Sequence, residues 1–131
     1  MPKVLIIEDE PLIARMYQKA LGFDHFEVVS ANGGSEGLQK VKSEKPDIVL
    51  CDVMMPEPNG MQVLEAIKAD PETQNIPVIM LTNLSGKHDA DLAIQKGAQD
   101  FWVKKDTDHR QLGAKLKAIL EKQAPPSSQT S

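Results

Sequence analysis

The sequence predicts an α/β fold: a single, doubly wound, five-stranded parallel sheet in which strands and helices alternate as (βα)5. Its 131 residues amount to about one domain. Short runs rich in Val, Ile and Leu recur along the chain, and they are continuous rather than alternating, as in strands buried on both faces. Each gap between these runs is long enough for one helix. This β-α alternation favours right-handed crossovers with helices on both sides of the sheet.

Four predicted strands are strong and one is weak. The strong runs are Val4–Ile7, Ile48–Cys51, Val78–Leu81 and Phe101–Val103, and the weaker run is Glu27–Ala31. All five runs are short, as expected for strands that cross one layer of a small domain.

Three helices are predicted from apolar residues at helical spacing. The helix after the first strand can begin at Pro11, a residue that a first helical turn accepts. The helix after the third strand ends before Asp70-Pro71, and a capping box of Asp108 and Gln111 can begin the last helix. Their apolar positions are Ile13, Met16, Tyr17, Ala20 and Leu21, then Met61, Leu64 and Ile67, and finally Leu112, Leu116, Ile119 and Leu120.

The remaining two helices are predicted less strongly. Gly33, Gly34 and Gly37 weaken the segment that ends near Val41. The segment from Lys87 to Lys96 has few apolar residues for an inner face, and we expect it to pack shallowly. Those residues are Ala90, Ala93 and Ile94.

Composition excludes several classes of protein. A net charge of −4 argues against direct nucleic-acid binding, which needs clustered positive charge. No apolar run is long enough to span a membrane, and the first residues do not resemble a secretory leader. Cys51, the single cysteine, excludes an internal disulfide and is expected to be a small buried side chain. We therefore expect a cytoplasmic domain over residues 1–122, followed by a flexible tail or truncated linker over 123–131.

Polar residues follow the strong strands at the points where these strands end. Glu8 and Asp9, Asp52, Thr82 and Lys104 take these positions. Because the carboxyl ends of parallel strands share one edge of a sheet, we expect these side chains to converge there. The three carboxylates repel one another unless a cation lies among them, and Mg²⁺ is a hard ion that suits such ligands. Mg²⁺ with a lysine and a hydroxyl is typical of phosphoryl transfer, in which a carboxylate can be the nucleophile. Asp52 is the strongest candidate, since it stands alone at its strand end.

These residues resemble the receiver domain of response regulators, the phosphoacceptor module of two-component signalling. The resemblance covers essentially residues 3–122 and rests on the order and spacing of four motifs. They are Val4-Leu-Ile-Ile-Glu-Asp-Glu-Pro11, Pro46-Asp-Ile-Val-Leu-Cys-Asp-Val-Met-Met-Pro-Glu-Pro-Asn-Gly60, Pro77-Val-Ile-Met-Leu-Thr82 and Gly97-Ala-Gln-Asp-Phe-Trp-Val-Lys104. The resemblance implies a flavodoxin-like fold with strand order 2-1-3-4-5.

The resemblance also implies a role for each site residue. Asp52 is the expected phosphoacceptor. Glu8, Asp9, Asp52 and the backbone carbonyl of Met54 are expected to hold Mg²⁺. Thr82 and Lys104 are expected to bind the phosphoryl group, and Phe101 to act as an aromatic switch. Residues at the positions of Met54 and Leu84 flank the path of hydrolytic water in receivers. Both residues are apolar here, so we expect slow hydrolysis of the phosphoryl group on Asp52.

Two departures from the receiver pattern are visible. Glu8 stands where Asp is commoner. Lys105 follows Lys104 where receivers usually have a proline after a cis bond. Since a cis bond before a residue other than proline costs roughly 2.5–4 kcal/mol, we expect the Lys104–Lys105 bond to be trans. Lys105 also adds positive charge beside the pocket, which favours an acidic partner or the incoming phosphoryl donor.

The expected partners follow from the resemblance. A histidine kinase or a histidine phosphotransfer protein would supply phosphate, and a downstream protein or fused output domain would read the switch. A homodimer through the last two helices and the last strand is a further expectation. The domain is expected to signal rather than to act as a metabolic enzyme.

Three alternative functions were considered. The first is a pseudo-receiver, although Asp9, Asp52, Thr82 and Lys104 are intact. A Mg²⁺-dependent phosphohydrolase is the second, but Val53-Met54 supplies no second carboxylate after the nucleophile. A flavin-binding flavodoxin ranks last.

Overall fold

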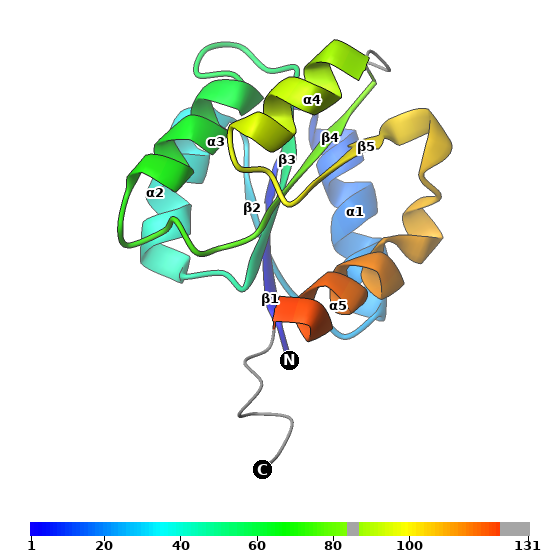
Figure 1. The fold of residues 1–131 in the computed structure, drawn as a ribbon. Coiled ribbons are helices and arrows are strands. Elements are labelled where there is room, and N and C mark those ends of the chain that lie inside the picture. Colours follow the sequence, from blue (N-terminus) through cyan, green and yellow to red (C-terminus); the bar gives the residue numbers. More distant parts are fainter. Residues whose placement is uncertain (84–86, 124–131) are drawn as a thin grey trace.

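The computed structural model describes residues 1–83 and 87–123, which form one five-stranded parallel sheet with helices on both faces (Figure 1). The strand order is β2-β1-β3-β4-β5. The strands span Lys3–Ile7 (β1), Glu27–Ala31 (β2), Ile48–Asp52 (β3), Val78–Thr82 (β4) and Asp100–Val103 (β5). All five predicted strands and their order are confirmed.

Five α-helices connect and follow the strands, with two short 3-10 turns between β5 and the last helix. Figure 1 shows α1 and α5 on one side of the sheet and α2, α3 and α4 on the other. The helices span Pro11–Phe23 (α1), Gly34–Glu44 (α2), Gly60–Ala69 (α3), Lys87–Gln95 (α4) and Leu112–Gln123 (α5), and the 3-10 turns span Lys104–Asp106 (η1) and His109–Gln111 (η2). None of the helices in these ranges combines the length and the apolar character needed to cross a membrane.

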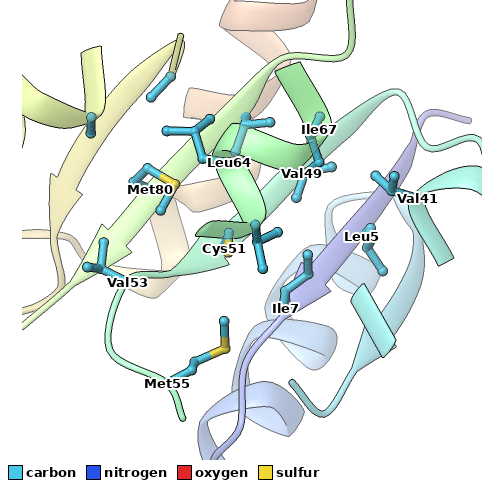
Figure 2. Close-up of a cluster of buried hydrophobic side chains, with 14 of the residues drawn as sticks. Leu5, Ile7, Val41, Val49, Cys51, Val53, Met55, Leu64, Ile67 and Met80 are labelled. Carbon is cyan, nitrogen blue, oxygen red and sulfur yellow. The ribbon is translucent and has the colours of Figure 1, made fainter. Parts of the chain in front are cut away.

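The sheet divides the core into two layers. One layer lies under α2, α3 and α4 and includes Cys51 of β3 and Met80 of β4 (Figure 2). The other lies under α1 and α5 and includes Leu50 of β3. Phe101 packs against the first layer and Trp102 against the second, as their alternation along β5 predicts. The central strands β3 and β4 are therefore buried on both faces.

Two local predictions are wrong. The reciprocal capping box of Asp108 and Gln111 does not form, because η2 precedes α5. The Asp108 carboxylate instead accepts hydrogen bonds from the backbone N–H and the guanidinium of Arg110. Ile94, predicted on the inner face of α4, is 50% exposed, whereas Ala93, predicted on the same face, is buried as expected.

Three further points concern a peptide bond, a helix cap and the described ranges. The bond between Lys104 and Lys105 is trans, as expected, and the cis peptide bond among the described residues is Glu57–Pro58. The sequence did not predict that a capping box of Asn59 and Gln62 begins α3. Leu84 and residues 124–131 of the predicted tail lie outside the described residues.

Candidate phosphoacceptor site

The three predicted carboxylates converge at the carboxyl edge of β1 and β3. Glu8 and Asp9 follow β1 directly, and Asp52 is the last residue of β3. One carboxylate oxygen from each lies within 4.8 Å of the others. The neighbouring strands β1 and β3 pair in register, with Ile7 opposite Cys51, and this register brings the residues after them side by side.

Burial dominates the electrostatics of Glu8. Its side chain is only 2% exposed, and that of Asp52 is 6% exposed, whereas Asp9 is half-buried. Loss of solvent raises the pKa of Glu8 to about 7, and the nearby charge of Asp52 adds to this rise. A hydrogen bond from Lys104 opposes it without cancelling it. Additional positive charge nearby therefore favours the ionised form of Glu8.

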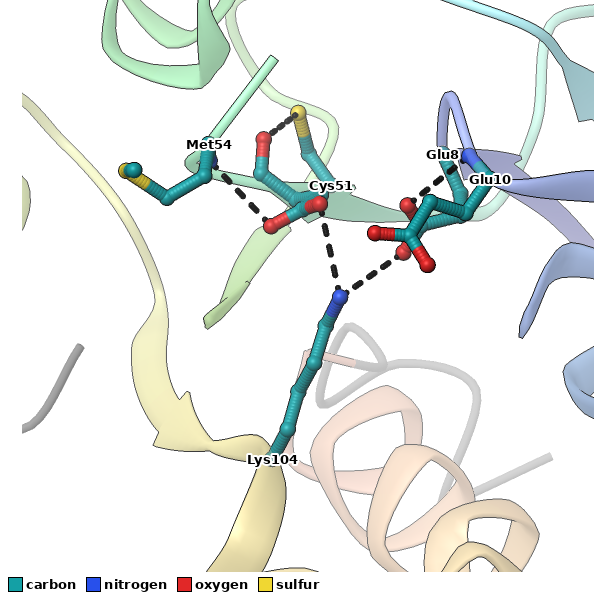
Figure 3. A network of polar contacts seen from close by, with 6 residues as sticks. Glu8, Glu10, Cys51, Met54 and Lys104 are labelled. Carbon is teal, nitrogen blue, oxygen red and sulfur yellow. Dashed lines mark hydrogen bonds and ion pairs between the residues drawn. The ribbon is translucent and has the colours of Figure 1, made fainter. Parts of the chain in front are cut away.

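Lys104 supplies part of that charge. It follows β5, and its Nζ lies 2.9 Å from Glu8 Oε1 and 3.3 Å from Asp52 Oδ2 (Figure 3). Burial lowers the pKa of Lys104, but the hydrogen bond to Glu8 and the charges of Asp52 and Glu8 outweigh it and raise that pKa. The ammonium thus bridges two carboxylates. The contact with Glu8 was not expected from the sequence, which predicted that Lys104 binds the phosphoryl group.

Backbone contacts fix the orientation of Asp52. Its Oδ1 accepts a hydrogen bond of 3.2 Å from the N–H of Met54. The N–H of Val53 donates to the carbonyl of Leu81, and the N–H of Gly60 donates to the carbonyl of Val53. A side chain at Gly60 would collide with the backbone of Asp52 and Val53. The loop after β3 and the start of α3 therefore pack tightly around the predicted phosphoacceptor.

The other predicted site residues lie around this centre. Met54 extends away from the Asp52 carboxylate and is 58% exposed (Figure 3). Thr82 ends β4 and is fully buried, one residue beyond Leu81, which is opposite Asp52 in the sheet. Phe101 is half-buried against the layer under α4. The structure thus brings Thr82 to the same edge of the sheet and leaves Phe101 further back along β5.

Tyr17 is a residue near the site whose role the sequence analysis missed. It lies on the buried face of α1 and is 6% exposed. Burial raises the pKa of its phenol, and the charges of Lys104, Glu8 and Asp52 also act on it. The apolar spacing of α1 accounted for Tyr17 as a core residue. Its hydroxyl, on a helix that begins two residues after Asp9, was the signal available.

The donor set fits a hard divalent ion. Three carboxylates face one ammonium, so the centre retains negative charge that Mg²⁺ would neutralise. Both oxygens of Glu8 already accept hydrogen bonds, one from Lys104 and one from the N–H of Glu10. Both oxygens of Asp52 also accept hydrogen bonds, from Lys104 and from the N–H of Met54, so Asp9 keeps the most free acceptor capacity of the three. The three side chains are therefore suited to hold Mg²⁺, and the ion would compete with Lys104 for them.

Comparison with known proteins identifies the family. The family model described as "Response regulator receiver domain" matches residues 4–117. The chain belongs to this family. It is 38% identical over its full length to a transcriptional regulatory protein CpxR homolog of Haemophilus influenzae, and covers 56% of that protein. It is 33% identical over 129 residues to the transcriptional regulatory protein PhoP of Bacillus subtilis, covering 97% of this chain and 52% of that protein.

Solved receiver structures share the fold. A CheY-like receiver domain protein of Methanospirillum hungatei superimposes with a TM-score of 0.84 at 28% identity, covering 94% of this chain and 96% of that one. The receiver domain of Francisella response regulator 1452 gives a TM-score of 0.86 at 22% identity, over 95% of this chain and 100% of that one, and shows the fold alone. The fold is flavodoxin-like, as expected. This receiver spans about half the length of the curated relatives cited above.

Family membership establishes a general role. Receiver domains belong to two-component systems, in which response regulators work with histidine kinases and output domains. They are signalling domains rather than enzymes of metabolism. Receivers generally use Mg²⁺ at an acidic pocket, and this receiver has an acidic group of that kind.

Proposed function

We propose that Asp52 accepts a phosphoryl group from a phosphohistidine of a histidine kinase or phosphotransfer protein, with Mg²⁺ held by Glu8, Asp9, Asp52 and the carbonyl of Met54. The observation that carries this proposal is the position of Asp52. It is the buried carboxylate that Lys104 and the N–H of Met54 both contact. A carboxylate oxygen attacks phosphorus, and the bond from phosphorus to the donor nitrogen breaks. Mg²⁺ would supply charge stabilisation for the transferring group.

The proposed switch uses Thr82, Lys104 and Phe101. The phosphoryl group would hydrogen-bond to Thr82 and pair with Lys104, and Phe101 would turn inward as Thr82 moves. Thr82 and Val103 are opposite each other in β4 and β5, so a change at Thr82 acts directly on the strand that carries Phe101. The shift is limited by the difference in affinity of the phosphoryl group for the two states.

The lifetime of the phosphorylated state forms part of the proposal. Met54 and Leu84 have apolar side chains, which cannot orient an attacking water by hydrogen bonding. Slow hydrolysis would leave time for a downstream protein or fused output domain to bind, or for a homodimer to form through α4, β5 and α5. The proposal includes a cytoplasmic location for the 1–122 receiver.

The decisive experiment is incubation with acetyl phosphate and Mg²⁺, followed by intact mass measurement. Wild type should gain the mass of one phosphoryl group, and Asp52→Ala should gain none. Asp91→Asn removes an exposed carboxylate of α4 and should behave as wild type. Absence of the added mass on wild type contradicts the proposed function. A mass gain that persists in Asp52→Ala contradicts the assignment of the phosphoacceptor.

A further inference from the structure

A groove of about 310 Å³ opens beside the phosphoacceptor, between α1 and the segment that follows β5. Its walls carry two ammonium groups, an amide, two hydroxyls and an imidazole. These groups belong to Lys104, Lys105, Asn83, Tyr17, Thr107 and His109, and Ile13 and Met16 complete the lining. A groove with this many donors and few carboxylates is suited to an anion.

The groove is continuous with the site through two side chains. Lys104 lines the groove, and its ammonium reaches Asp52 Oδ2 at 3.3 Å. Tyr17 also lines the groove, and the charges of Lys104, Glu8 and Asp52 all act on its phenol. A small molecule that places a phosphoryl group at Asp52 can therefore extend its remaining atoms into the groove.

Lys105 gives the groove its distinctive charge. It is exposed, and it follows Lys104 through a trans bond at the position where receivers usually have a proline. The hydroxyl of Thr107 donates 2.8 Å to the carbonyl of Val103, and its N–H donates to the carbonyl of Lys104. These contacts hold the turn that carries Lys105 against the end of β5. Lys105 is therefore carried on a turn whose backbone is held by these two hydrogen bonds.

We propose that this groove receives the acyl part of a small acyl phosphate, and that Lys105 stabilises the carboxylate that leaves as the phosphoryl group passes to Asp52. This inference rests on the proposed function. An oxygen of Asp52 forms the new bond to phosphorus, and the bond from phosphorus to the bridging oxygen breaks. The electron pair of that bond stays on the bridging oxygen, which departs as part of a carboxylate, and no proton is required.

The nature of the leaving group makes the inference specific. A departing carboxylate develops negative charge, which a nearby ammonium stabilises more in the transition state than in the bound donor. Donors that release a neutral amine develop no such charge. Lys105 should therefore favour donors with a phosphorus–oxygen anhydride bond over donors with a phosphorus–nitrogen bond.

The test compares acetyl phosphate with phosphoramidate, which releases ammonia, as donors to Asp52 in the presence of Mg²⁺. Lys105→Gln removes the charge, Lys105→Arg keeps it, and Lys122→Gln removes an equivalent exposed charge from the end of α5. Initial rates are measured by intact mass at one fixed ionic strength. Lys105→Gln should slow transfer from acetyl phosphate by about fivefold, the order expected for one partly screened charge.

The second donor and the control variants decide the interpretation. Transfer from phosphoramidate to Lys105→Gln should stay within about twofold of wild type, and Lys105→Arg and Lys122→Gln should match wild type with both donors. Equal slowing with both donors, or no slowing with either, overturns the role of Lys105. If neither donor phosphorylates wild type, the proposed function fails instead.

Discussion

The centre of the sheet and its β5 edge are packed very differently. Every residue of β3 and β4 is buried, and Asp52 and Thr82 end these strands. At the edge, the four residues of β5 are half-buried or exposed, and among the described side chains of α4 only Ala93 is buried. The carboxylate site is thus built on the most rigid part of the molecule. The segment proposed to switch is the one that can move at the lowest cost.

The two regions should differ most in the free energy of unfolding that is lost when an apolar side chain is shortened to alanine. Leu50→Ala in β3 should lower the free energy of unfolding by about 3–5 kcal/mol, because it leaves a cavity between two packed layers. Ile94→Ala in α4 should cost less than about 1 kcal/mol, since that side chain is 50% exposed. Urea denaturation of both variants measures this difference. Similar losses would show that α4 is as firmly packed as the centre.

Two glycine substitutions test how tightly the backbone packs around Asp52. Gly60→Ala should destabilise the receiver by about 2–3 kcal/mol, because the new Cβ meets the backbone of Asp52 and Val53. Gly22→Ala in α1 is the matched control, since its Cβ meets no atom within 4 Å. That variant should gain about 0.5–1 kcal/mol from helix propensity. Thermal and urea unfolding report both changes, and a neutral Gly60→Ala would contradict the packing described around Asp52.

The buried Glu8 should make the stability of the centre depend on pH. Its pKa is about 7 when folded and ordinarily 4.5, so the folded state holds the proton more tightly. This stabilising contribution is complete below about pH 4.5 and is lost as pH rises through 7. In EDTA, the free energy of unfolding should fall by about 2 kcal/mol between pH 5 and 8.

Two controls accompany the pH measurement. Glu8→Gln should remove this part of the slope, whatever its effect on stability at one pH. Added Mg²⁺ should stabilise the receiver most at the higher pH, where Glu8 is ionised. An unchanged slope in Glu8→Gln would assign the pH dependence to another group.

The smallest expected effect concerns the edge. The ammonium of Lys115 in α5 lies 5.1 Å from the centre of the Trp102 ring, and the indole N–H donates to Asp100. Lys115→Ala should cost about 0.5 kcal/mol, as for other exposed cation–π contacts. The same variant should change the emission of Trp102, the single tryptophan. A loss above about 2 kcal/mol would mean that the edge is more firmly coupled to α5 than its exposure indicates.

The fold and the site centre could be predicted from sequence because both depend on strand ends. Continuous apolar runs identify buried strands, and Asp52 and Lys104 follow from where those runs stop. The shared edge of the sheet then brings them together, as observed. The same reasoning placed Phe101 and Trp102 on opposite layers, since side chains alternate along a strand.

Other features of the fold and the site depend on distances between side chains and on helix orientations, which the spacing of residues in the sequence does not specify. Lys104 Nζ lies 2.9 Å from Glu8 and 3.3 Å from Asp52, and the positions of the strand ends do not specify which carboxylate it approaches more closely. Ile94 is exposed because α4 turns Ala93 rather than Ile94 to the sheet. The sequence also could not show that Tyr17 borders the groove lined by Lys104 and Lys105, since that depends on how η1 and η2 approach α1.

The burial of Cys51 has a practical consequence for spectroscopy. This single thiol is fully buried, and burial raises its pKa further above neutral pH, so it carries almost no thiolate. Reagents that modify cysteine should not react with Cys51 while the protein is folded. A new cysteine on an exposed position of α4 could therefore carry a spin label or fluorophore in the native background. Distances from such a probe would follow the movement of the edge in solution, without first replacing a residue that adjoins Asp52.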